Sequence, residues 1–202
     1  MTVADPLPAV EAEAERLLRL LMHVDCDPHG RTWNLDTCRE IAPLTLEINR
    51  LKREKDAVIL THSYVEPEII YGVGDFKGDS YYLSEKARDS RAKIIVFAGV
   101  VFMAETAKIL SPHATVVVPD RHSGCSLADS IDGEGVRRLK ALYPDATVVC
   151  YINSTAEVKA ESDVCVTSGN VYDIVANLPA QRVLFVPDRL MAENVREELK
   201  RR

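Results

Sequence analysis

The fold of this chain is decided by two stretches, A-V-I-L-T-H-S-Y at residues 57–64 and T-V-V-C-Y-I-N-S at residues 147–154. Each is an apolar run that ends in polar side chains, and each is followed by a serine-containing turn, G-D-S at 78–80 and V-T-S-G-N at 166–170. Three pairs of polar residues occupy equivalent places in the two copies: His62 with Tyr151, Tyr64 with Asn153, and Ser80 with Ser168. The members of these pairs are 89, 89 and 88 residues apart, which predicts two similar units that face one shared site.

Short apolar runs alternate with helical stretches from residue 57 onward. Runs that are apolar throughout are typical of parallel strands covered on both faces, and the alternation favours βαβ units. Strands are expected at 57–61, 93–98, 115–118, 147–152, 163–166 and 182–186. Helices are expected at 66–73, 80–90, 102–110, 133–143, 155–161, 170–178 and 190–201. Each half reaches a third apolar run that ends in V-P-D-R, at 118–121 and 186–189, so these tetrapeptides are expected to be equivalent.

Residues 1–55 are predicted to be a helical extension. Residues 8–24 have the apolar spacing of an amphipathic helix, and a second helix is expected at 36–55 after a loop rich in turn residues. Asp36 is a plausible N-cap of this second helix, and Pro43 is expected to kink or split it. The predicted fold class is therefore α/β, with two similar three-layer βαβαβ domains that have short parallel sheets. The predicted domains are a helical extension at 1–55 and α/β domains at 56–122 and 123–202.

The composition indicates a folded protein and argues against two classes of partner. Apolar residues make up 47% of the 202 residues and the net charge is −6, so a packed core is expected. No basic run is present, so neither nucleic acid nor an anionic membrane is an expected partner. The start of the sequence lacks the features of a secretion signal, and the longest apolar stretch is about half of the ~20 residues that span a bilayer. We therefore expect a cytoplasmic location.

The five cysteines do not predict a disulfide framework, because their number is odd and no C-x-x-C pair occurs. Cys150 and Cys165 lie in apolar runs and are interpreted as small buried hydrophobic residues. Cys125 lies in a polar loop beside a glycine and before a short predicted helix, which favours a nucleophile or a metal ligand. Cys26 and Cys38 remain unassigned.

Ligands of parallel α/β sheets gather at the carboxyl ends of the strands, where His62, Tyr64, Tyr151 and Asn153 are expected. Ser80 and Ser168 are each expected to open a helix, where free N–H groups and the helix dipole favour anions. The sequence thus predicts a ligand with two or more carboxylate or phosphate groups. The alternatives are that the serines are simple N-caps, that His62 is structural, and that Tyr151 and Asn153, on one face of a strand, form a buried hydrogen-bonding pair.

At these residues the chain resembles the quinolinate synthases. The resemblance covers roughly residues 40–200 and is most specific in the F-M-A-E-T-A-K-I-L-S-P run and in P-D followed by G-C-S-L-A-D. The matching segments are T-H-S-Y-V-E-P-E (61–68), G-D-S (78–80), G-V-V-F-M-A-E-T-A-K-I-L-S-P (99–112), V-V-P-D-R-H-S-G-C-S-L-A-D (117–129), Y-I-N-S-T-A-E-V-K-A (151–160), V-T-S-G-N (166–170) and V-P-D-R (186–189).

The resemblance implies an enzyme of de novo NAD biosynthesis. Members of this family condense iminoaspartate with dihydroxyacetone phosphate to give quinolinate, in three α/β domains around a [4Fe-4S] cluster held by three cysteines. One iron is left open as a Lewis acid. The resemblance implies these roles: Cys125 as the first cluster cysteine; His62 and Tyr64 in substrate contact and proton transfer; Tyr151 and Asn153 near the open iron, with Tyr151 catalytic; Ser80 and Ser168 in binding carboxylate or phosphate; and Met103 near the cavity.

The family's two later cluster cysteines and its third domain have no counterpart in these 202 residues. The expectation is therefore a truncated or split quinolinate synthase with little activity alone, completed by a separate third-domain chain and supplied with iminoaspartate by an L-aspartate oxidase. The alternatives are a non-catalytic module that binds small anions such as dicarboxylates or triose phosphates, and an inactive fragment that self-associates through an exposed apolar surface.

Overall fold

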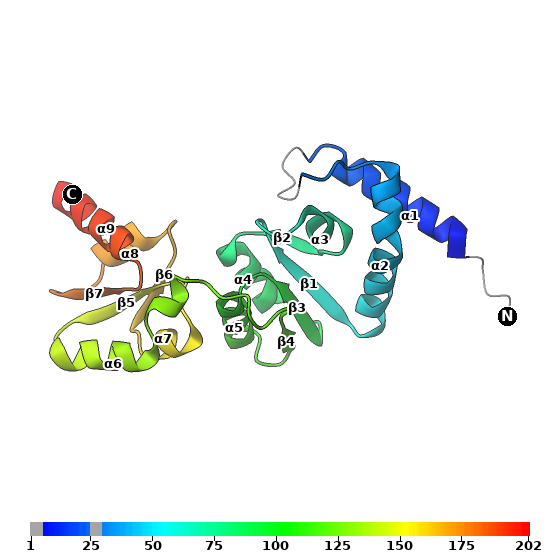
Figure 1. The fold of residues 1–202 in the computed structure, drawn as a ribbon. Coiled ribbons are helices and arrows are strands. Elements are labelled where there is room, and N and C mark those ends of the chain that lie inside the picture. The colour runs from blue at the N-terminus through cyan, green and yellow to red at the C-terminus, as the bar shows by residue number, and fades with distance from the viewer. Residues whose placement is uncertain (1–5, 25–29) are drawn as a thin grey trace. The chain divides into compact units, whose positions relative to one another are not determined.

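The computed structural model describes residues 6–24 and 30–202 (Figure 1). It divides the chain into two units, one made of residues up to Gly99 with Ala107–Pro119, and a second made of Val100–Thr106 with Asp120–Arg202. The first unit includes the helices of the N-terminal extension. The second unit includes residues 100–106, which lie before the domain boundary expected at 122/123. Within the described residues, no helix combines the length and the apolar character needed to cross a membrane.

The first unit contains a parallel sheet with the strand order β2-β1-β3-β4. Leu60, Ile95 and Phe97 on its central strands are fully buried. The strands and their connecting helices are β1 (Ala57–His62), α3 (Pro67–Gly72), β2 (Phe76–Gly78), α4 (Ser80–Asp89), β3 (Ile94–Ala98), α5 (Val101–Leu110) and β4 (Thr115–Val117). Strand β2 is absent from the sequence-based assignment, because three residues with an exposed lysine carry no apolar pattern.

The second unit contains a parallel sheet with the order β6-β5-β7, which is the same arrangement as β2-β1-β3. Its elements are the short 3₁₀ helix η1 (Ala128–Ser130), α6 (Gly133–Leu142), β5 (Thr147–Tyr151), α7 (Ala156–Ala160), β6 (Val164–Val166), α8 (Val171–Ala176), β7 (Val183–Val186) and α9 (Arg189–Arg201). The expected equivalence of the two V-P-D-R tetrapeptides is wrong. The first follows β4, whereas the second follows β7, the counterpart of β3.

Both faces of the second sheet are covered, as the continuous apolar runs predict. Val148 and Cys150 pack with Val136 of α6 and Val158 of α7, whereas the intervening Val149 packs on the opposite face against α8 and α9 (Figure 1). Cys150 is fully buried, in agreement with its interpretation as a core residue. Cys165 is exposed, so the same interpretation of Cys165 is wrong, because β6 is an edge strand that helices cover incompletely.

Strand β7 lies at the other edge of this sheet, and no counterpart of β4 pairs with it among the described residues. A hollow of about 670 Å³ lies beside it, between α8 and α9. Val183 and Phe185 of β7 line the hollow together with Val175 of α8 and Val195 of α9. The edge of β7 is thus bordered by apolar side chains.

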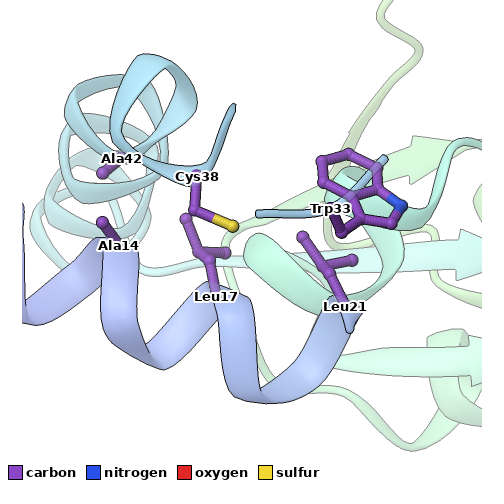
Figure 2. Packing of buried hydrophobic residues seen from close by; sticks show 6 residues of the cluster. All are labelled: Ala14, Leu17, Leu21, Trp33, Cys38 and Ala42. Atoms are coloured by element: carbon purple, nitrogen blue, oxygen red, sulfur yellow. The ribbon is translucent and has the colours of Figure 1, made fainter. Parts of the chain in front are cut away.

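Helices α1 (Pro6–Leu21) and α2 (Leu35–Glu54) pack against each other through small and aliphatic side chains. Figure 2 shows Ala14 facing Ala42, and Leu17 facing Cys38. The cluster also contains Leu21 and Trp33, and Tyr71 of α3 packs against it. Cys38, unassigned from the sequence, is therefore a core residue of the helical extension. Cys26 falls outside the described residues.

Side chains of α1 and α2 cap the C-terminal end of α3. Arg16 Nη2 and Asn49 Nδ2 donate to the carbonyl oxygen of Gly72 at 3.0 and 3.1 Å, and Lys52 Nζ donates to that of Val73 at 2.9 Å. Carbonyl groups at a helix end have no partner within the helix, so these donors satisfy them. The helical extension is therefore attached to α3 of the first unit by hydrogen bonds as well as by apolar contacts.

Asn34, rather than Asp36, is the N-cap of α2. Its Oδ1 accepts from the Thr37 N–H at 3.0 Å, and Thr37 Oγ1 accepts from the Asn34 N–H at 3.1 Å, which together form a capping box. The helix is not split at Pro43, which lies between the buried Ala42 and Thr45. Packing on both sides of the proline outweighs the lost backbone hydrogen bond.

Replacing Asn34 with alanine should lower the free energy of unfolding by about 1 kcal/mol, because the N-cap acceptor is lost. Asp36→Ala, the matched control, should change it by less than about 0.5 kcal/mol, because Asp36 makes an exposed ion pair with Arg39. Urea denaturation followed by the fluorescence of Trp33, the single tryptophan and a member of the adjacent core, measures both values. An equal or larger loss in Asp36→Ala would contradict the assignment of the cap.

Candidate functional site

The carboxyl ends of β1 and β2 bring together a first strand-end cluster, defined here as His62, Tyr64, Asp79 and Ser80. His62 pairs in register with Gly78, and the Ser63 N–H donates to the Gly78 carbonyl at 3.0 Å. The rings of His62 and Tyr64 lie with their centroids 4.0 Å apart and their planes inclined by 34°. Tyr64 is exposed and His62 is half-buried. The strand ends therefore hold both rings beside the start of α4, as the sequence predicts.

Ser80 is the first residue of α4, but it is not the N-cap. Asp79 takes that position, and its Oδ1 accepts from the Tyr82 N–H at 2.8 Å. The first N–H groups of α4 thus lie beside a carboxylate, which weakens the attraction of this helix end for an anion. Asp79 was not predicted as a site residue, although aspartate immediately before a helical stretch is a common N-cap signal.

Burial lowers the pKa of His62, and the negative charge of Asp79 offsets part of this effect. Nδ1 of His62 is buried and has no hydrogen-bond partner within the described part of the chain. The imidazole is therefore neutral at pH 7 and can accept a proton or a hydrogen bond. Because the unfolded chain binds this proton more tightly, His62 favours unfolding as the pH falls below about 6.5.

The carboxyl ends of β5 and β6 form the second strand-end cluster, defined as Tyr151, Asn153 and Ser168. Tyr151 pairs in register with Val166, and the Ile152 N–H donates to the Val166 carbonyl at 2.8 Å. Strand β5 ends at Tyr151, so Asn153 is held by the bend that follows rather than by the alternation of a strand. The buried Ser154 fixes this bend by donating from Oγ to the Tyr151 carbonyl at 2.7 Å.

Ser168 does not open a helix, contrary to expectation. It is exposed in a turn, and α8 begins at Val171 with Asn170 before it. Asn170 Oδ1 accepts from the Thr167 N–H at 2.7 Å, while Asn170 N–H donates back to the Thr167 carbonyl at 3.2 Å. The helix-terminus anion cradle predicted at Ser168 is therefore absent, and so is the alternative role of Ser168 as an N-cap. Its position near the end of β6 is as predicted.

Cys125 lies, half-exposed, in a loop that hydrogen bonds hold at both ends. Its N–H donates to Asp129 Oδ2 at 3.1 Å, and its carbonyl accepts from the Asp129 N–H at 2.8 Å. Upstream, the Ser123 carbonyl accepts from the Val101 N–H at 2.9 Å, which ties the loop to the start of α5. A side chain at Gly124 would meet Asp129 Oδ2 at 2.9 Å, so glycine permits this close turn. The short helix predicted after Cys125 is present as η1.

The second unit also places Glu105 and Lys159 near the second strand-end cluster, and the sequence did not single out either residue. Glu105 Oε2 accepts from the Ala156 N–H at 2.8 Å, at the start of α7. Lys159 Nζ donates to the Ser154 carbonyl and lies 5.5 Å from the ring centroid of Phe102. Burial lowers the pKa of Lys159. Met103 is buried in the same first part of α5. Lys159 thus contacts the bend that carries Asn153.

The class of protein follows from these features. Parallel βαβ sheets with polar side chains at the carboxyl ends of their strands are typical of α/β enzymes that act on small molecules. Within that class, the chain belongs to the quinolinate synthetase A protein family, whose model matches residues 46–202.

Curated relatives agree with this assignment. The quinolinate synthase of Caulobacter vibrioides is 52% identical over 158 residues, which cover 76% of this chain and 43% of the relative. Quinolinate synthase 2 of Mesorhizobium japonicum is 54% identical over 145 residues, covering 72% of this chain and 45% of the relative. The quinolinate synthase of Clostridioides difficile is 51% identical over 155 residues, covering 77% of this chain and 51% of the relative. The chain thus spans about half the length of these relatives.

Replacing Asp79 with asparagine should lower the pKa of His62 further, because the charge that raises it is removed while an N-cap side chain is kept. Titration of the His62 Cε1–H signal by NMR measures this change. Glu85→Gln on the same helix is the matched control and should leave the His62 titration unchanged. A parent pKa at or above about 6.5 would contradict the lowering of the His62 pKa by burial. An unchanged or raised pKa in Asp79→Asn would show that the charge of Asp79 does not act on His62 in this way.

Proposed function

We propose that this chain supplies substrate-binding residues of a quinolinate synthase, which condenses iminoaspartate with dihydroxyacetone phosphate to quinolinate in NAD biosynthesis. The names of the relatives support the reaction, and the observation that carries the proposal is the pair of strand-end clusters. Each cluster combines an aromatic side chain, a second hydrogen-bonding side chain and a serine. A dicarboxylate and a phosphorylated ketose offer acceptor oxygens for these groups.

In this proposal His62 acts as the proton acceptor. The condensation requires protons to leave carbon, nitrogen and hydroxyl groups, and a neutral imidazole is suited to accept them at pH 7. The tilted contact with the Tyr64 ring restricts the imidazole, while the phenol groups of Tyr64 and Tyr151 offer further proton donors. Asn153 and the two serines hydrogen-bond to carboxylate or phosphate oxygens. We propose each of these roles from the hydrogen-bonding and proton-transfer chemistry of the side chain.

The residues that the structure describes do not fit a complete [4Fe-4S] site. Such a cluster is held by three or four thiolates. Among the described residues, Cys38 belongs to the helical core, Cys150 and Cys165 belong to the second sheet, and no group of three metal-binding side chains occurs. We therefore assign to Cys125 at most one ligand position, to be completed by thiolates outside these residues. A separate third-domain chain is the proposed source, and an L-aspartate oxidase is the proposed supplier of iminoaspartate.

A reducing cytoplasmic location is part of this proposal, because Cys38, Cys125, Cys150 and Cys165 are free thiols. The second candidate function is a non-catalytic module that binds dicarboxylates or triose phosphates. The incomplete cluster site favours this candidate for the chain acting alone.

Dihydroxyacetone phosphate and quinolinate, tested separately, should raise the thermal unfolding temperature of the chain, because each would bind the folded state. Ser80→Ala or Ser168→Ala should weaken the binding of at least one of these probes about tenfold, as expected for a lost hydrogen bond to a charged group. Thermal shift measured against ligand concentration gives the apparent Kd of each variant.

Ser90→Ala is the matched control for Ser80→Ala, because Ser90 lies at the opposite end of the same helix. Its dissociation constants should equal those of the parent. The proposal fails if neither probe stabilises the chain, or if both serine variants at the strand ends keep the parent affinity.

Anaerobic reconstitution with iron and sulfide should leave far fewer than about four irons per chain, because only one thiol of the described residues is placed for a cluster. Iron and sulfide assays on the desalted protein measure this, with Cys125→Ala and Cys165→Ser run in parallel. About four irons per chain that are lost only in Cys125→Ala would mean that other thiols of the chain complete the site. That outcome would leave the thermal-shift test of ligand binding unaffected.

A further inference from the structure

Two cysteines face each other across neighbouring strands of the second sheet. Cys150 of β5 and Cys165 of β6 are direct partners in the parallel register. Residues paired in this way point to the same face of the sheet, so the two cysteine side chains are neighbours. Cys150 is fully buried, whereas Cys165 lies exposed on the edge strand. The pair therefore has one sulfur within the core and one within reach of solvent.

The surroundings of the pair favour one thiolate. The hydrogen bond from Cys165 lowers the pKa of Cys150 despite its burial, and the Ser162 hydroxyl and the Lys159 ammonium add to this effect. The same interaction with Cys150 raises the pKa of Cys165. The two thiols thus share one proton and titrate as a pair. A shared thiolate of this kind is a stronger nucleophile than an ordinary buried cysteine.

We propose that Cys150 and Cys165 form a modification site at which a peroxide converts the two thiols into a reversible inter-strand disulfide. This site lies outside the proposed synthase chemistry and requires none of it. Among the described residues, neither of the other two cysteines lies beside Cys150 and Cys165. Cys125 lies in its own loop, and Cys38 is enclosed by the helices of the first unit.

The reaction proceeds in two balanced steps. Cys150 carries the favoured thiolate, and transfer of the Cys165 proton to it makes the more accessible Cys165 sulfur the nucleophile. This sulfur attacks one peroxide oxygen, an S–O bond replaces the O–O bond, and the departing oxygen takes a proton from solvent to give an alcohol or water. The Cys150 sulfur then attacks the resulting sulfenic acid, loses its proton and expels the hydroxyl group as water. The sulfurs lose two electrons and the peroxide gains them. A dithiol reductant reverses the change by disulfide exchange.

The backbone permits this bond with little movement. Neighbouring strands lie about 4.7–4.9 Å apart, within the range of about 4.4–6.8 Å between Cα atoms across disulfides. A disulfide requires the two β-carbons to lie about 3.5–4.5 Å apart, which is closer than the spacing between the strands. Strand β6 can supply that shift, because it has only three residues and pairs with β5 alone.

Mass spectrometry tests the proposal directly. Trypsin cuts after Lys159, so Cys150 lies in peptide 141–159 and Cys165 in peptide 160–182. After treatment of the full chain with hydrogen peroxide and blocking of free thiols, most of these peptides should appear as one linked species, two hydrogens lighter than their sum. Dithiothreitol should restore the separate peptides. The link should be found in monomeric chains on a non-reducing gel.

Variants separate the pair from other thiols. Cys165→Ser, a change at an exposed position, should abolish the link, while Cys125→Ser should leave it unchanged, with circular dichroism as the check of folding. The proposal is overturned if the parent peptides stay unlinked while Cys125 is oxidised. It is equally overturned if Cys150 and Cys165 are oxidised separately to sulfinic acids, or if the link occurs only between chains.

Discussion

The parallel pairing of the first two strands of each unit is the constraint on which the rest depends. In β1 and β2, and again in β5 and β6, the register aligns the carboxyl ends of strands that are separated along the chain by a helix. That alignment places His62 beside the G-D-S turn and Tyr151 beside the T-S-G-N turn. A shift of one residue in either register would turn every side chain of the strand to the opposite face. The clusters and the Cys150–Cys165 contact are therefore consequences of the same pairing.

The two copies of this arrangement have different electrostatics. In the first, a half-buried imidazole lies near a carboxylate that caps a ten-residue helix. In the second, the following helix has six residues, and a partly buried lysine holds the bend after the strand. One copy thus offers a neutral base, whereas the other offers a cationic neighbour.

The sequence predicts the elements whose signal is local, and it misses those that depend on tertiary contacts. Continuous apolar runs identify six strands, but F-K-G in β2 is a strand only because β1 provides its hydrogen-bond partners. Without β2, counting the strands wrongly aligns the two V-P-D-R tetrapeptides, which follow β4 and β7. Asn34 and Asp36 are both good caps by residue type, and only the fold of the preceding turn selects Asn34. The strand-end residues are predictable from their order along the chain, and Asp79 from its position before a helix. Glu105 and Lys159 act through tertiary contacts that sequence spacing does not encode.

The outer edge of β7 has a consequence for the behaviour of the protein in solution. A strand that pairs on one side only presents a row of backbone donors and acceptors, and here apolar side chains of β7 and α9 border that row. Such an edge can template the addition of a further strand from any chain that supplies one. Exposure of this edge makes self-association more favourable as the protein concentration rises, and added salt, which screens the net charge of −6, strengthens the tendency.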